Sequence, residues 1–238
     1  MKNKKIYDLV VASLILAMIV ILTFTPIGYI PTPLLSITIV HIPVLVGAYL
    51  YGKKGGLLFG LAFGLSSMLN ALTRGVADAV FVYPWVSILP RLIFGLASGV
   101  LFEIIKKKSL KKQLYLIPIG TFIATFFFHT WVVFFPYFFS YAYLFQHVTP
   151  DRALFILAAT SFASSGALEA FVAAIVVPVI IFAIEKEFRE IKKHKTSSYA
   201  DSDSDSLGYG KLTKEKKSLW CYLLMLEILI LYLALVMV

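Results

Sequence analysis

Long apolar runs separated by short polar or basic segments dominate the chain and predict membrane-spanning helices. A hydrocarbon core of ~30 Å, crossed at about 1.5 Å per residue, requires about 20 mostly apolar residues per helix. On this criterion we expect spanning helices at residues 7–25, 35–51, 55–72, 85–105, 114–139, 153–185 and 219–238. The predicted fold class is therefore an all-α polytopic membrane protein, with a six-helix bundle and a seventh, C-terminal transmembrane helix.

The polar segments divide the chain into three predicted parts. Residues 1–193 are expected to form the six-helix membrane domain. Residues 194–217 are poor in apolar residues and rich in Ser, Asp and Lys, which is typical of a flexible linker. Residues 218–238 carry the seventh helix, which would serve either as a simple anchor or as a helix that binds a partner.

The stretch from Ser36 to Gly75 predicts two helices that fold back on each other through the basic turn YGKKGG. In the second helix Gly56, Gly60 and Gly64 recur at every fourth position, so they share one face. A face without side chains lets a neighbouring backbone approach closely, as helix association in lipid requires. We therefore expect this hairpin to pack tightly against another helix.

The basic residues predict the orientation of the bundle. The chain is 60% hydrophobic with a net charge of +9, and all its Lys and Arg except Arg74, Arg91 and Arg152 fall on one side of the bundle when helices alternate. An excess of Lys and Arg marks cytoplasmic loops, so we expect a multi-pass protein of the cell membrane with a cytoplasmic N-terminus. Basic residues placed between apolar runs do not indicate nucleic-acid binding. The single Cys221 excludes an intrachain disulfide and a thiolate metal cluster.

Four ionisable residues inside the apolar runs are candidates for a site, because such groups tend to face a bundle interior or cavity. Arg91 would take a substrate carboxylate or phosphate, or would form a structural ion pair or extend to the interface. Glu169 would pair with Arg91, bind a cationic group or relay a proton. His129 and His41 would contact a ligand, or would donate to a nearby backbone carbonyl.

A second group of polar and aromatic residues is predicted at the outer mouth of the bundle. Aromatic residues also populate membrane interfaces because of their amphipathic rings, so each alone says little. Their coincidence with an amide and two charged residues favours a small site for an organic molecule. The group comprises Asn70, Arg74, Asp78, Tyr83 and Trp85, followed later in the chain by Tyr137, Tyr141 and Gln146.

Local motifs for nucleotides, metals and proteolysis do not account for the chain. GxxxxGK[ST] is missing from YGKKGG, and neither HExxH nor CxxC occurs. ASSG at residues 163–166 has no leading glycine and no histidine on a later helix, so a serine nucleophile would have no base. We expect no cofactor, no metal and no catalytic residue.

Three segments give the chain a resemblance to a known family. HIPVLVGAYLYGKKGGLLFGLAFGLSSMLNAL resembles the helix 2–3 hairpin of the substrate-binding (S) components of energy-coupling factor (ECF) vitamin transporters. SILPRLIFGLASGVLFE is similar to their fourth helix, and SSGALEAFVAAIVVPVI to their last. The likeness covers about residues 6–193, with six helices and an internal N-terminus. The linker and the seventh helix have no counterpart in this pattern.

This resemblance implies a binding subunit rather than an enzyme. Such a protein binds one water-soluble vitamin or precursor from outside and passes it on by tilting in the membrane. Its partners are a transmembrane coupling subunit and two cytoplasmic ATPases, which fits the missing nucleotide site. Small residues on the first helix face the coupling subunit in this family, and Ser13 and Ala17 match that role here.

The sequence favours pantothenate among the possible vitamins. IxHIPVLVGA is most similar to the pantothenate and pyrimidine-precursor branches, and Arg91 suits the carboxylate of pantothenate. Hydroxymethylpyrimidine, pyridoxine and riboflavin are alternatives. An intramembrane enzyme that uses His129, Glu169 and Arg91 on a lipid-linked substrate is a rival from another class. A structural protein of an envelope complex is a third possibility.

Overall fold

The computed structural model describes residues 2–30, 37–74, 80–144 and 152–201, and these residues are almost entirely helical. The helices are α1 (Lys2–Phe24), α2 (His41–Arg74), α3 (Pro84–Lys106), α4 (Leu110–Ile123), α5 (Val132–Leu144) and α6 (Arg152–Asp201). A short 3-10 turn η1 (Pro26–Gly28), an eight-residue π-helix η3 (Ala124–Trp131) and the strands β1 (Tyr29–Ile30) and β2 (Ile37–Thr38) complete the elements. The strands are antiparallel, with Tyr29 opposite Thr38.

Five described helical segments are long and apolar enough to cross a membrane. They are Ile6–Phe24, His41–Thr73, Pro84–Lys106, Leu110–Ser140 and Phe155–Lys186. The all-α polytopic class is therefore confirmed, whereas the count of six helices plus one stays a prediction. The chain divides into two compact units, residues 1–180 and 181–238. Helix α6 continues to Asp201, through residues 194–201 of the predicted linker, and the predicted seventh helix lies outside the described residues.

Helix α2 folds back on itself at Gly52, as the YGKKGG turn predicts. Gly52 has φ of 64° and ψ of −152°, a backbone conformation that residues other than glycine rarely adopt. Beyond the turn, the ring of Phe59 lies against Gly47, and Gly56 lies against Ala48. Residues eight or twelve apart in a straight helix would be separated by about 12–18 Å. The contacts therefore place the two arms side by side.

Two side chains of α3 and one backbone carbonyl of α1 hold this turn. Glu103 Oε1 accepts a hydrogen bond of 2.9 Å from the backbone N–H of Lys53. Lys106 donates to the carbonyl of Tyr49 and lies 4.1 Å from the centre of its ring. The hydroxyl of Tyr51 donates to the carbonyl of Asp8 over 2.8 Å. The turn is thereby tied to both neighbouring helices.

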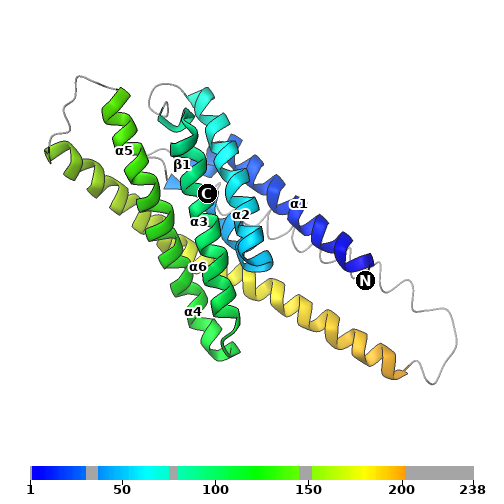
Figure 1. The fold of residues 1–238 in the computed structure, drawn as a ribbon. Helices are drawn as coiled ribbons and strands as arrows, with labels where there is room; N and C mark the ends of the chain where they lie inside the picture. Colours follow the sequence, from blue (N-terminus) through cyan, green and yellow to red (C-terminus); the bar gives the residue numbers. More distant parts are fainter. Residues whose placement is uncertain (1, 31–36, 75–79, 145–151, 202–238) are drawn as a thin grey trace. The chain divides into compact units, whose positions relative to one another are not determined.

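The second arm of α2 packs against α3 through glycines on both helices (Figure 1). A Cβ atom added to Gly56 would lie 2.0 Å from the carbonyl oxygen of Gly95, and one added to Gly95 would lie 2.1 Å from that of Gly56. A Cβ atom on Gly60 would lie 2.4 Å from the carbonyl oxygen of Arg91. The expected close approach of backbones along the glycine face is confirmed, and it sets the position of Arg91.

Helix α1 packs on α2 through Val11, Ile15 and Ile19, which are buried at intervals of one helical turn. Near the end of α1, the side-chain amide of Asn70 donates a 2.7 Å hydrogen bond to the carbonyl of Thr23. The Thr23 hydroxyl lies 3.1 Å from that of Ser66 and donates to the carbonyl of Ile19. Polar residues between these helices are therefore satisfied inside the protein.

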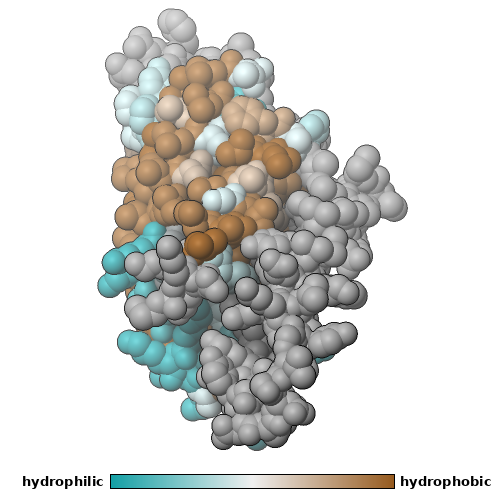
Figure 2. All heavy atoms as spheres, turned by 90° about the vertical axis from the view of Figure 1, so that its right-hand side faces the viewer, coloured by the Kyte–Doolittle hydropathy of each residue, from teal (hydrophilic) through white to brown (hydrophobic). Residues whose placement is uncertain are grey.

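Apolar side chains cover the outer surfaces of the helices. In the second arm of α2 an exposed leucine stripe lies beside the glycine face: Leu57, Leu61, Leu65, Leu69 and Leu72. Figure 2 shows one face on which apolar residues form a broad area, with hydrophilic residues gathered toward one end. Because the chain has membrane-spanning helices, we assign such surfaces to lipid contact.

The glycine packing predicts a sharp difference between two alanine substitutions. Gly95→Ala places a methyl group against the backbone of Gly56, which cannot move without separating the helices. Overpacking of this kind costs typically about 1–3 kcal/mol, so we expect a lower apparent melting temperature in detergent.

The matched control is Gly120→Ala, whose added methyl would meet the flexible end of Ile105 at 2.7 Å. We expect this variant to melt close to the melting temperature of the parent. Tryptophan fluorescence would report the melting of both variants. Equal melting temperatures for the two variants would contradict the proposed packing.

Candidate functional site

Three polar side chains from separate helices meet in a buried cluster. His41 is the first residue of α2, His129 lies in η3 and Glu169 lies in α6. One nitrogen or oxygen atom from each lies within 4.8 Å of the others. All three side chains are buried, His41 almost completely. We call these residues the His–His–Glu cluster.

The π-helical segment η3 and the glycine at Gly166 bring His129 and Glu169 together. The helix predicted at residues 114–139 is interrupted by η3, whose wider turns shift the faces that its side chains occupy. A Cβ atom added to Gly166 would lie 2.2 Å from the hydroxyl oxygen of Thr130. The small residue therefore lets α6 approach η3 closely, one helical turn from Glu169.

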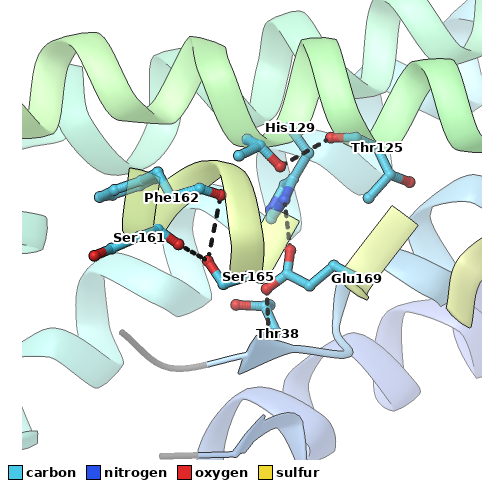
Figure 3. Close-up of polar contacts among 8 residues, drawn as sticks. Thr38, Thr125, His129, Ser161, Phe162, Ser165 and Glu169 are labelled. Carbon is cyan, nitrogen blue, oxygen red and sulfur yellow. Dashed lines mark hydrogen bonds and ion pairs between the residues drawn. The ribbon is translucent and has the colours of Figure 1, made fainter. Parts of the chain in front are cut away.

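Glu169 joins three parts of the chain through its two carboxylate oxygens. Oε1 accepts a hydrogen bond of 2.5 Å from the backbone N–H of Thr38 in β2. Oε2 lies 3.3 Å from Nδ1 of His129. Figure 3 shows the carboxylate between these two partners. A buried carboxylate is costly unless it is hydrogen-bonded, and the Thr38 N–H supplies such a bond.

The two histidines are packed but poorly hydrogen-bonded. Their rings stack with centroids 5.2 Å apart and planes inclined by 28°. His129 also contacts Phe63 at 5.8 Å and Phe94 at 5.2 Å. Among the described residues, none of these four buried imidazole nitrogens has a partner at hydrogen-bond geometry, and the 3.3 Å contact of His129 with Glu169 also falls outside it. Four buried nitrogens therefore retain unused bonding capacity.

Arg91 lies close to this cluster, in aromatic surroundings. Its Nη1 donates a hydrogen bond of 2.6 Å to the carbonyl of Val86. Within the described residues, its Nε has no hydrogen-bond partner. The guanidinium carbon lies 5.5 Å from the ring centre of Phe63 and 5.1 Å from that of Phe81. Phe63 thus lies against both Arg91 and His129. Within the described residues, Glu169 Oε2 lies in contact with Nδ1 of His129 rather than with the guanidinium of Arg91.

The residues predicted at the outer mouth make other contacts. The amide of Asn70 is used by Thr23, as described above, and its carbonyl oxygen lies 3.3 Å from the hydroxyl of Thr73. Tyr83 and Trp85 stack with centroids 4.7 Å apart, and Trp85 donates to Ser140 over 3.1 Å. The Arg74 side chain and Asp78 lie outside the described residues. A common mouth site for these residues stays a prediction.

Sequence reasoning identified Arg91, His129 and Glu169, but did not group them with the backbone of Thr38 or with the rings of Phe63 and Phe94. A backbone N–H leaves no residue-type signal, and phenylalanines are too frequent in this chain to stand out. The signal for His41 was its position inside an apolar run beside the predicted hairpin.

Where the structure describes the side chains of α6, its serines bond to the preceding turn of the helix. Ser165 donates to the carbonyl of Ser161 over 2.9 Å, and Ser161 donates to the carbonyl of Leu157 over 2.8 Å (Figure 3 shows the first bond). Hydroxyl groups in membrane helices commonly bond to the preceding turn in this way. The chemistry that this region offers is ligand binding. Arg91 can hold an anion, and the His–His–Glu cluster beside it can hold a metal ion.

Comparison with known proteins agrees with the features of the fold. The family model described as "ECF transporter, substrate-specific component" matches residues 7–181, most of the chain. No curated protein matches the chain significantly.

The bond between Glu169 and Thr38 predicts a specific pattern of amide exchange. We expect Glu169→Ala to accelerate hydrogen exchange at the Thr38 amide at least tenfold, because its acceptor is lost. Glu169→Gln keeps a side-chain oxygen and should preserve most of the protection. The measurement is hydrogen exchange followed by mass spectrometry on the detergent-purified protein.

Glu103→Ala provides the matched control, since Glu103 caps the Lys53 amide in the same way. It should accelerate exchange at Lys53 and leave Thr38 unchanged. Unaltered exchange at Thr38 in Glu169→Ala would show that this carboxylate does not anchor β2.

Proposed function

This chain belongs to the family of substrate-specific components of ECF transporters, and we propose that the region around its buried Arg91 binds an anionic water-soluble vitamin, with pantothenate as the first candidate. Membership of the family makes it a multi-pass membrane protein that binds a small substrate and associates with ECF coupling and ATPase subunits. It is a transporter subunit rather than an enzyme. Three points go beyond family membership and are proposed here: which vitamin is bound, which residues bind it, and which side of the membrane the N-terminus occupies.

The environment of Arg91 is the observation that supports an anionic substrate. The guanidinium is buried between aromatic rings, and within the described residues no carboxylate forms an ion pair with it. A buried charge without a partner is strongly unfavourable. A substrate carboxylate would supply the missing charge and could bond to the guanidinium through two oxygens. Arg91 would thus hold the anionic end of the substrate.

This charge requirement separates the candidate vitamins. Pantothenate carries a carboxylate at neutral pH, whereas hydroxymethylpyrimidine, pyridoxine and riboflavin carry no comparable anionic group. His129, Glu169 and the aromatic rings around them would then contact the polar and apolar remainder of the molecule. The polar contacts fix orientation, and the rings provide apolar area, as in most small-molecule sites.

Residues 37–40, which lead from β2 into α2, would cover this site. Strand β2 is attached to the cluster through the bond between Thr38 and Glu169. A segment attached to a residue of the site can respond to the presence of substrate, as loops over binding sites commonly do. This arrangement supports a binding component, in which a loop closes over the ligand.

The outer face of α1 is proposed to meet the coupling subunit. Ser13 and Ala17 are exposed and lie one helical turn apart, away from the buried Val11, Ile15 and Ile19. Small exposed residues permit a partner helix to approach closely in lipid. The basic turn of α2 and the basic end of α3 lie together, which supports a cytoplasmic position for that end and for the N-terminus. The protein would then deliver its substrate by tilting against this partner.

Direct binding tests the substrate. We would titrate the purified protein with pantothenate, hydroxymethylpyrimidine, pyridoxine and riboflavin by calorimetry, without any ATPase present. We expect one-to-one nanomolar binding of pantothenate alone. Arg91→Ala should weaken this binding at least a hundredfold. Arg91→Lys should weaken it less, because lysine keeps the positive charge but loses the planar pair of donors that matches a carboxylate.

Glu103→Ala serves as the control, since this residue contacts the α2 turn about 18 Å along α3 from Arg91. It should bind the vitamin with parental affinity. Binding of one of the uncharged vitamins instead, or full affinity in Arg91→Ala, would contradict the anion proposal. Absence of binding by the whole panel would contradict the proposed substrate class.

The α1 interface predicts a separate defect. Ala17→Trp should reduce co-purification with the coupling subunit at least fivefold and leave vitamin affinity unchanged, because the bulky ring blocks close helix approach. Leu114→Trp alters an exposed position on a different helix, α4, and should retain the complex. Equal complex formation by both variants would exclude this face.

A further inference from the structure

We propose that His41, His129 and Glu169 form a binding site for one divalent transition-metal ion of the Zn²⁺ type. The proposal rests on the juxtaposition of three ligand atoms and on the unused nitrogens of both buried histidines. It does not depend on which vitamin the protein binds.

The spacing of the ligand atoms fits a small transition-metal ion. Zn²⁺ binds histidine nitrogen at about 2.0–2.1 Å and carboxylate oxygen at about 2.0–2.2 Å, so tetrahedral ligands lie roughly 3.3–3.5 Å apart. Nδ1 of His129 and Oε2 of Glu169 are already 3.3 Å apart. All three ligand atoms lie within 4.8 Å, so a movement of about 1.5 Å or less completes the triangle. Rotation of the stacked His41 ring provides such a movement.

The unused nitrogens indicate what the cluster lacks. His41 is 1% exposed and His129 is 6% exposed, and in the part of the chain that the structure describes none of their nitrogens meets a partner at hydrogen-bond geometry. A buried polar atom without a partner is unfavourable, and each specific case requires an explanation. A metal ion bound by one nitrogen from each ring would satisfy one atom of each histidine.

Glu169 is oriented as a metal-binding carboxylate commonly is. Its Oε1 is held by the Thr38 N–H, so Oε2 remains directed toward His129. Hydrogen bonds to the second oxygen of a carboxylate ligand fix its orientation and strengthen the site. The donor set of two imidazoles and one carboxylate suits Zn²⁺, Ni²⁺ or Co²⁺ better than Mg²⁺ or Ca²⁺, which prefer oxygen ligands.

Three protein ligands leave a fourth position open. A divalent ion beside Arg91 would make the buried charge strongly positive, with Glu169 as the one carboxylate in the cluster. The open position would therefore take an anionic ligand. The identity of this ligand rests on the proposed function: it would be the carboxylate of the substrate, held jointly by the metal ion and Arg91.

Metal binding by the whole chain is the first test. Protein carrying a tag without histidine would be treated with chelator and titrated with Zn²⁺, Co²⁺ and Mg²⁺ by calorimetry. We expect one Zn²⁺ per chain with micromolar or tighter affinity, visible absorption from bound Co²⁺ and no comparable binding of Mg²⁺. X-ray absorption of the Zn²⁺ form should show two imidazoles, which tests the site without any substitution.

Variants locate the ion. His41→Ala, His129→Ala and Glu169→Gln should each weaken Zn²⁺ binding at least tenfold. The control is the double variant His147→Ala/His194→Ala, which removes the two histidines outside the cluster and should bind as the parent does. Failure of the parent to bind Zn²⁺ or Co²⁺, an absorption spectrum without imidazole, or loss of binding only in the control would overturn the proposal.

Vitamin titrations with and without chelator separate the two proposals. If pantothenate binds equally well to metal-free protein, the substrate proposal stands and the joint site is excluded. If Zn²⁺ binds at the cluster and no vitamin binds, the metal site stands and the proposed function fails.

Discussion

A charged or polar side chain inside hydrocarbon must find its partners within the protein, and this constraint organises the site. Glu169 is buried in α6, so its two oxygens draw together β2 through the Thr38 N–H and η3 through His129. The residues involved are distant in the sequence, and the carboxylate connects them. The requirement that buried charge be satisfied thus determines which surfaces of the helices face inward.

A scaffold without side chains makes this arrangement possible. Gly56 and Gly60 of α2 lie against the backbone of α3 at Gly95 and Arg91, so the arginine is fixed by contact between backbones. In lipid, where burial of apolar area gives little preference for one packing over another, such close contact is the main source of specificity. Gly166 has the same role between α6 and η3. The polar groups of the candidate site are therefore positioned by glycines, which have no side chain of their own.

The sequence predicted the scaffold better than the site. Helix positions followed from apolar length, and the hairpin followed from YGKKGG and the glycines at every fourth position. Arg91, His129 and Glu169 were identified because charge is rare inside apolar runs. The connection of Asn70 to Thr23 could not be predicted, since its partner is a backbone carbonyl on another helix. The π-helix around His129 was equally inaccessible, because its change of pitch leaves no clear mark in residue types.

Under the proposed function, the cluster would also connect substrate binding to strand β2. Arg91 and His129 both contact Phe63, while Glu169 binds both His129 and the backbone of β2. A ligand that changes the position of His129 or Glu169 therefore also changes the anchor of the segment before α2. Binding can shift an equilibrium only through contacts that differ between its two states. The bond between Thr38 and Glu169 would be such a contact if β2 leaves the site together with the substrate. Release of the substrate would then require this bond to break, which gives the movement in the coupling complex a defined point of action.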